Sequence, residues 1–164
     1  MDGMDEKRGH EPANPFAQMH RELRNAHRAL IAALADMEAV TRDPTPERER
    51  YSAARWRLSN VSFARRSLWQ RIYRALADCT LGADAATLAE LQQADIATTY
   101  ASAAYVREWT AAAIDADWAG YCAASKEIRW KMKAAISVEQ RLLYPLLARN
   151  SQTPRPGPQS REAA

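Results

Sequence analysis

Four side chains of this sequence are the strongest candidates for chemistry. His20 and His27 are seven residues apart, so in a helix both face the same side. Glu139 and Tyr144 lie in the segment ISVEQRLLYPLLARN, residues 136–150, where leucines surround the carboxylate. Because a lone buried carboxylate is costly, Glu139 needs a partner if it lies inside the protein. His20 or His27 can supply that partner.

Three interpretations of these residues are open. In the first, His20 or His27 binds a metal ion or a polar ligand together with Glu139 and Asp95. In the second, the same residues form only a buried His–Glu hydrogen bond at the edge of a helical seam, on which Arg65 also lies. In the third, Glu139 is a general base for an organic substrate, assisted by Tyr144 or His27.

The elements that must position these residues are helices. The chain has 164 residues, is 47% hydrophobic and contains only five glycines, and alanine is abundant whereas runs of Val, Ile and Thr are scarce. This composition predicts one all-helical domain. Helices of this length with short links favour an antiparallel up-down-up-down four-helix bundle over residues 14–150. Residues 1–13 and 151–164 are polar and are predicted to be disordered tails.

Turn and capping residues predict where each helix begins and ends. Asn-Pro at 14–15 opens the first helix, and the prolines of TRDPTP separate it from a second helix over 46–78. Gly82 is predicted to be a left-handed turn residue, and Asp84 to cap the third helix. The chain turns again within AAAIDADWAG, and the fourth helix is predicted to end near Ala148.

Tryptophan and arginine residues of the second helix indicate an interaction surface. Trp56 and Trp69 fall outside the predicted core stripe, and Arg65 and Arg66 lie between them in the sequence. Exposed tryptophan beside arginine is typical of protein–protein contacts, so a protein partner or a homodimer is expected. The alternative is that these tryptophans only pack between helices. Nucleic acid is not expected as a partner because successive helical positions distribute the arginines around the helix.

Several function classes are excluded by composition and motif. The net charge of +3 is only mildly basic, and there is no Gly-rich phosphate loop. No apolar run approaches the roughly 20 residues needed to span a bilayer, and the N-terminus has no apolar signal segment, so a cytoplasmic protein is expected. Cys79 and Cys122 form no metal motif and are predicted to be buried thiols.

The chain also resembles the hemerythrin-like (HHE cation-binding) domain. The resemblance covers residues 17–149 and is carried by HRELRNAHRALIAAL, IDADWAGY and VEQRLLYPLL. It implies a four-helix bundle with an oxo-bridged di-iron centre, held mainly by histidines and by two bridging carboxylates. Such centres serve oxygen binding, iron handling or sensing.

The ligand positions of that family are only partly occupied here. The resemblance places the histidine of the first helix on His27 or His20 and the glutamate of the last helix on Glu139, but Ala135 stands where the family has a histidine. No histidine follows His27 anywhere in the chain. The resemblance thus implies the scaffold but not its usual cofactor.

The second helix departs from the family in the same way. Its end, RRSLWQRIYRAL, is similar to SVEQRLLYPLL when Tyr73 is matched to Tyr144. This match places Ala64 and Leu68 at the two ligand positions of the second helix, and neither residue can bind a metal ion.

The leading prediction is a non-enzymatic, metal-depleted binding or regulatory module without a cofactor. It would bind a protein partner, or a small molecule in the bundle core. The alternative is an iron- or haem-dependent oxygen or redox sensor, or an oxidoreductase, that uses His20 or His27 with Glu139.

Overall fold

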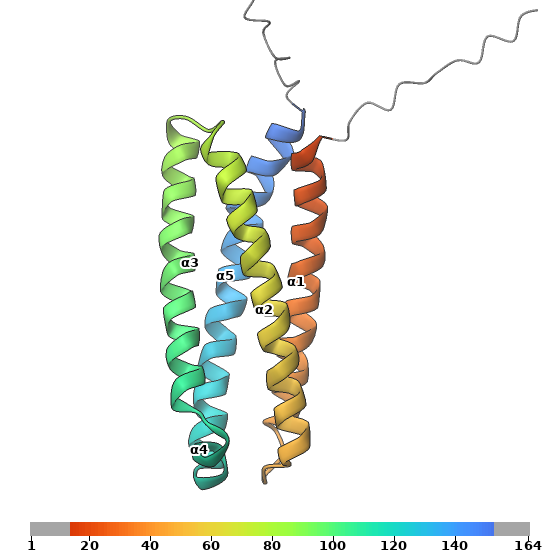
Figure 1. Ribbon diagram of the computed structural model, residues 1–164, viewed down its shortest axis with the longest axis vertical. Helices are drawn as coiled ribbons and strands as arrows, with labels where there is room; N and C mark the ends of the chain where they lie inside the picture. The colour runs from red at the N-terminus through yellow and green to blue at the C-terminus, as the bar shows by residue number, and fades with distance from the viewer. Residues whose placement is uncertain (1–13, 153–164) are drawn as a thin grey trace, which may run out of the picture.

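The computed structural model describes residues 14–152, and this part of the chain consists of helices joined by short links (Figure 1). The helices are α1 (Pro15–Val40), α2 (Arg48–Ala77), α3 (Ala83–Glu108), α4 (Ala111–Ala116) and α5 (Trp118–Gln152). The prediction of an all-helical protein is confirmed. The short helix α4 was not predicted and lies within the segment AAAIDADWAG, which was expected to be a turn.

The four long helices lie side by side, and each runs in the opposite direction to the one before it (Figure 1). Side-chain contacts fix which ends meet. The Asn14 side chain donates a hydrogen bond to the carbonyl of Ser151 at 2.8 Å, which joins the start of α1 to the end of α5. At the other end, the Trp118 indole N–H donates to the carbonyl of Asp43 at 2.9 Å. Helix α1 packs on α2 and α5, whereas α3 packs mainly on α5.

The predicted starts of the helices are close to the observed ones, with one correction. Asn14 caps α1 as expected, because its side-chain oxygen accepts from the backbone N–H of Phe16 at 2.9 Å. Gly82 has a φ of 58°, which glycine adopts without steric cost. Gly82 also occupies the cap position of α3, so the prediction that Asp84 is the cap was wrong. Asp84 lies in the first turn of α3 and pairs with Arg149 of α5.

Helix α5 is longer than predicted. It continues past Pro145 to Gln152, two residues into the segment that was expected to be a tail. Pro145 cannot donate a backbone hydrogen bond, but its ring is exposed, and the following Leu146 and Leu147 are buried. Burial of these leucines holds the last turns in place. The other residues of the predicted tails, 1–13 and 153–164, lie outside the described part of the chain.

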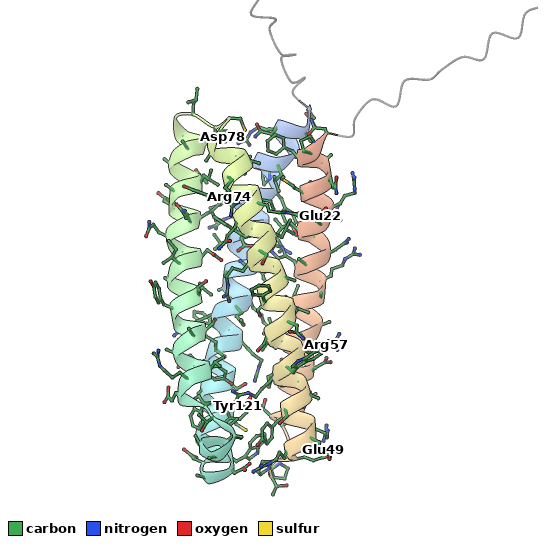
Figure 2. All side chains as sticks on the ribbon, viewed as in Figure 1. Glu22, Glu49, Arg57, Arg74, Asp78 and Tyr121 are labelled. Atoms are coloured by element: carbon green, nitrogen blue, oxygen red, sulfur yellow. The ribbon has the colours of Figure 1, made fainter. Side chains whose placement is uncertain are left out.

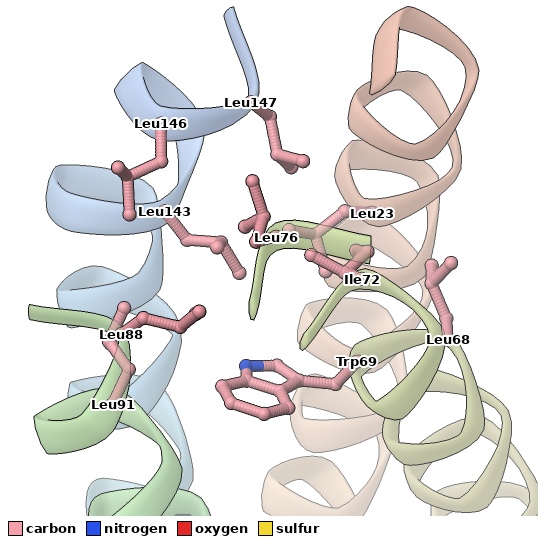
Figure 3. Close-up of a cluster of buried hydrophobic side chains, with 10 residues drawn as sticks. All are labelled: Leu23, Leu68, Trp69, Ile72, Leu76, Leu88, Leu91, Leu143, Leu146 and Leu147. Atoms are coloured by element: carbon pink, nitrogen blue, oxygen red, sulfur yellow. The ribbon is translucent and has the colours of Figure 1, made fainter. Parts of the chain in front are cut away.

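The core near the end where α1 begins is apolar and is built by all four long helices (Figure 3). The buried members of this upper cluster are Leu23, Leu68, Trp69, Ile72, Leu76, Leu88, Leu91, Leu143, Leu146 and Leu147. Trp69 is only 2% exposed, and Figure 3 shows its ring between α2 and the leucines of α3. The prediction that Trp69 belongs to an interaction surface was therefore wrong, because the indole packs between helices.

The rest of the interior is divided into two further apolar clusters. A middle cluster contains Leu30, Leu34 and Ile136. An aromatic cluster lies near α4, where Tyr121 contacts the rings of Tyr51, Tyr105, Trp109 and Trp118. Figure 2 shows Tyr121 near this end of the molecule, far from Arg74 and Asp78 at the end of α2. Polar side chains lie between the upper and middle clusters.

Two further expectations can be compared with the structure. No helix within residues 14–152 is both long enough and apolar enough to cross a membrane. Cys79 is exposed and Cys122 is half-buried, so the prediction that both cysteines are buried was wrong. Cys79 lies just beyond the end of α2, in the link to α3, where neighbouring helices do not cover it.

Candidate functional site: a buried polar layer

A layer of polar side chains separates the upper cluster from the middle cluster, and each long helix contributes at least one member. His27 comes from α1, Arg65 from α2, Asp95 from α3 and Glu139 from α5. His27 is 1% exposed, Arg65 8% and Glu139 4%, whereas Asp95 is closer to the surface. Apolar residues lie one turn away on either side along each of α1, α2 and α5. Groups buried this deeply must satisfy each other, because water cannot do so.

Hydrogen bonds connect the layer from end to end. Nε2 of His27 lies 2.7 Å from Oε2 of Glu139, and Arg65 donates to the other carboxylate oxygen of Glu139. A second nitrogen of the Arg65 guanidinium lies 3.4 Å from Oδ1 of Asp95. At the opposite end, the hydroxyl of Tyr144 lies 2.8 Å from Nδ1 of His27. The order of contacts is therefore Tyr144, His27, Glu139, Arg65 and Asp95.

The protonation state of His27 determines the direction of these hydrogen bonds. Burial, followed by the positive charge of Arg65, lowers the pKa of His27 to about 4. The ring is thus neutral at pH 7, with one N–H group. Because the Glu139 carboxylate can only accept, the Nε2–H of His27 donates to it. Nδ1 then accepts from the Tyr144 hydroxyl, whose pKa is raised by burial. Both oxygens of Glu139 are satisfied in this arrangement.

His20 is the candidate residue that the network leaves out. Its ring packs edge-on against Tyr144, with 4.9 Å between the ring centroids. Its Nε2 is buried and has no hydrogen-bond partner among the described residues. Burial, and then the charge of Arg24, lowers the pKa of His20. Of the two histidines proposed as partners for Glu139, the structure selects His27.

The network contains His27, Glu139, Tyr144 and Asp95 of the predicted polar residues, and it corrects the role of Arg65. Arg65 was assigned both to the seam of the second helix and to an interaction surface. The surface assignment was wrong, because its side chain is buried against Glu139. The available signal was its spacing: Arg65 lies four residues after Val61 and three before Leu68, within the apolar stripe.

The other two candidates for an interaction surface, Trp56 and Arg66, differ in their exposure to solvent. Trp56 is 71% exposed and stays a candidate for contact with a partner. Arg66 is half-buried and lines a cleft described below. Arg55, Arg65 and Arg66 therefore do not form an exposed arginine face on α2.

The residues of the layer do not fit a di-iron centre. Within residues 14–152, no group of three or more His, Cys, Asp and Glu side chains could hold a metal ion. Both oxygens of Glu139 are engaged by His27 and Arg65, and the Arg65 guanidinium places a positive charge where a metal cation would be repelled. Such a centre also needs more histidines than this layer provides.

The family resemblance places histidines at positions 135 and 64, and only the first of these positions faces the polar layer. Ala135 lines a cavity of about 20 Å³ beside Arg65 and Asp95, so it does face the polar layer. Ala64 is exposed on the outside of α2. A side chain at position 64 could not reach the layer, because the interior position of this turn is held by Arg65.

Metal removal is expected to leave the protein intact. Thermal unfolding after dialysis against a strong iron chelator should give the same midpoint as before, because no described side chain depends on a metal ion for its charge balance. Elemental analysis before dialysis should find far less than one iron per chain. A midpoint that falls on chelation and recovers with added Fe²⁺ would contradict this expectation.

A larger cleft lies between α2 and α3, with residues of α1 and α5 at its base. Its volume is about 590 Å³, within the range of small-molecule sites. The buried side chains of α3 are Leu88 and Leu91, both in its first half. Below them no side chain of α3 is buried, and several lining residues are small, among them Ser59 and Ser62 of α2 and Ser102 of α3. The helices do not close this space, which therefore opens to solvent.

Neither the cleft nor the smaller cavity is lined by His20, His27, Glu139 or Tyr144. Arg65 and Asp95 line the smaller cavity, which shares Ser62 and other residues with the cleft. A comparison of the chain with protein-family models, curated proteins and solved structures found no match. The function must therefore be argued from the geometry of the polar layer and the cleft.

Proposed function

We propose that this chain is an antiparallel four-helix bundle of hemerythrin-like architecture that works as a non-enzymatic, metal-independent binding module. Its ligand is a small molecule that occupies the cleft between α2 and α3. The observation that carries this proposal is the contrast between the two interior polar regions. In the layer around Glu139, His27 and both carboxylate oxygens are hydrogen-bonded, and among the described residues of the layer only Nε of Arg65 lacks a partner. The cleft of about 590 Å³ is open instead, and two polar groups in its lining, Nη1 of Arg55 and Oγ of Ser62, lack partners.

This proposal moves the ligand away from the bundle core. A ligand bound by His27, Glu139 and Tyr144 would have to break a network in which each group already has a partner. The same argument disfavours Glu139 as a general base. Its side chain is 5% exposed, and its two carboxylate oxygens are already engaged by His27 and Arg65, so neither oxygen is free to take a proton from a substrate. The layer is better suited to fixing how the four helices pack.

A cleft-filling substitution tests the proposal. Nile red, a neutral fluorophore that brightens in apolar sites, is expected to bind the wild-type protein with increased emission. Ala103→Phe places a ring in the cleft and should abolish most of the increase, because Ala103 lines it. Ala104→Phe is the matched control, since Ala104 is exposed and is not part of the lining. Equal fluorescence from both variants and the wild type would show that the dye does not use the cleft, and would count against the proposal.

The rival proposal is an iron- or haem-dependent sensor or oxidoreductase that uses His20 or His27 with Glu139. Its support is the sequence resemblance, and the chelation experiment above separates it from a metal-independent module. A cytoplasmic location and a protein partner or homodimer stay predictions. For a partner, the most exposed tryptophan of α2, Trp56, is the contact residue that we propose.

A further inference from the structure

The charge of the cleft indicates the class of its ligand. Three arginines line it, Arg55 and Arg66 from α2 and Arg107 from α3, and no aspartate or glutamate does. Among the described residues, none of these three arginines has a carboxylate within 4 Å, whereas Arg57 on the outside of α2 pairs with Asp36. The cleft thus carries a concentration of positive charge that nothing in its lining neutralises, and an anion would be attracted to it.

Two polar groups of the cleft also lack hydrogen-bond partners. Nη1 of Arg55 and Oγ of Ser62 are buried, and neither has a partner among the described residues. The guanidinium of Arg55 lies over the ring of Tyr121 at 5.6 Å, which compensates part of its charge but gives Nη1 no acceptor. Buried donors without acceptors are destabilising, so a ligand that brings oxygen atoms to them would bind favourably.

Part of the remaining lining is apolar. Leu58 and Phe63 of α2, Val106 of α3 and Met132 of α5 all line the cleft. Phe63 is 68% exposed and Val106 52% exposed, so both have apolar surface that a ligand can cover. Along α2, Arg55 and Arg66 are eleven residues apart, which corresponds to about 16 Å of helix. A compact anion such as phosphate would leave most of this apolar length uncovered.

We propose that the cleft binds an anionic amphiphile, with its carboxylate at Arg55 and its apolar chain extended along α2 toward Ser62 and Arg66. This inference rests on the proposed function, since it names the class of ligand for the same cleft. The carboxylate supplies acceptors to Nη1 of Arg55, and the chain covers Leu58, Phe63 and Val106. A neutral amphiphile of the same length covers the apolar walls but leaves Arg55 unpaired.

Calorimetric titration of the full-length protein with decanoate, decanol and acetate tests this inference. Decanoate is expected to bind at least tenfold more tightly than decanol, because a charged hydrogen bond at Arg55 is worth about that factor. Acetate should show no measurable binding, since it covers none of the apolar wall. Arg55→Met should weaken decanoate at least tenfold and leave decanol unchanged, and Arg57→Met, on the outer side of the same helix, should change neither.

The outcomes separate the two proposals. If decanol binds as tightly as decanoate, or if Arg55→Met leaves decanoate binding unchanged, the anionic assignment is overturned while Nile red binding still supports the cleft. If Ala103→Phe leaves decanoate binding unchanged, the amphiphile binds elsewhere and the inference fails. Should Arg55→Met not fold, the decanoate-to-decanol ratio of the wild-type protein decides the question by itself.

Discussion

Replacing Arg65 with methionine is expected to destabilise the protein by about 3–5 kcal/mol, which is the cost of leaving a buried charge without its partner. The side chain of Glu139 is 5% exposed and that of Arg65 is 9% exposed, so water cannot replace the lost guanidinium. Methionine matches much of the volume of arginine, which limits the contribution from lost packing. The measurement is the free energy of unfolding from urea denaturation at pH 7.

Two matched variants test whether the buried charge of Glu139 causes the loss of stability in Arg65→Met. Arg57→Met removes an arginine from the same helix that also pairs with a carboxylate, Asp36, but at the surface, so it should cost no more than about 1 kcal/mol. The double variant Arg65→Met/Glu139→Met should recover at least half of the loss, because a hydrophobic pair replaces the buried ion pair. Similar losses for Arg57→Met and Arg65→Met would show that burial of the pair is not what makes Arg65 important.

Protonation of His27 is expected to make the wild-type protein strongly sensitive to acid. The pKa of His27 is about 4 in the folded protein and near 6.5 in the unfolded chain. Between these values the unfolded chain binds a proton that the folded protein does not, so stability falls as the pH falls from 6.5 to 4. The shift of about 2.5 pH units corresponds to a loss on the order of 3 kcal/mol.

His27→Gln isolates this contribution. Glutamine does not titrate, and its amide can donate to Glu139 and accept from Tyr144. The measurement is the free energy of unfolding in urea, determined for both proteins at pH 7 and at pH 4. The decrease in this free energy from pH 7 to pH 4 should be smaller in the variant than in the wild type, by an amount on the order of 3 kcal/mol. The carboxylates titrate in both proteins, so their contribution to the pH dependence of stability cancels when the two proteins are compared. Parallel pH profiles would contradict the assignment of a neutral, buried His27.

The two predictions are linked through Glu139. In Arg65→Met the carboxylate of Glu139 lacks a cation, and His27, whose Nε2 lies 2.7 Å from it, is then the one contacting group among the described residues that can carry a positive charge. The pKa of His27 is therefore expected to rise above its ordinary value in this variant. The stability that it contributes would then be present at low pH and lost as the pH rises through the new pKa, opposite to the wild type. NMR titration of the His27 ring protons measures this change directly.

Much of the fold follows from local sequence signals. Asn14 before Pro15, the prolines of TRDPTP and the freedom of Gly82 each act within a few residues, so the limits of α1 and α2 and the start of α3 were predicted closely. The errors have different causes. Asp84 was assigned as the cap because aspartate favours that position, but α3 begins at Ala83, directly after Gly82. Helix α5 ends later than predicted because Leu146 and Leu147 are buried against other helices and hold its last turns in place.

The sequence by itself determined which faces of the helices point inward. A period of 3.6 residues places His27, Arg65 and Glu139 on the same stripes as the core leucines, whatever the neighbouring helices are. Only the tertiary structure decided which of these groups meet. Periodicity gives the rotation of a helix about its axis but not its position along that axis relative to the neighbouring helices. A displacement of one turn along the axis moves a side chain by about 5.4 Å.

That shift is enough to exchange a hydrogen-bonded partner for an apolar one. It is why the partner of Glu139 could be narrowed to His20 or His27 but not chosen between them. The cleft between α2 and α3 was not predicted at all. It depends on how far apart two helices lie, which is set by the packing of α3 on α5 and is not encoded in the pattern of either helix.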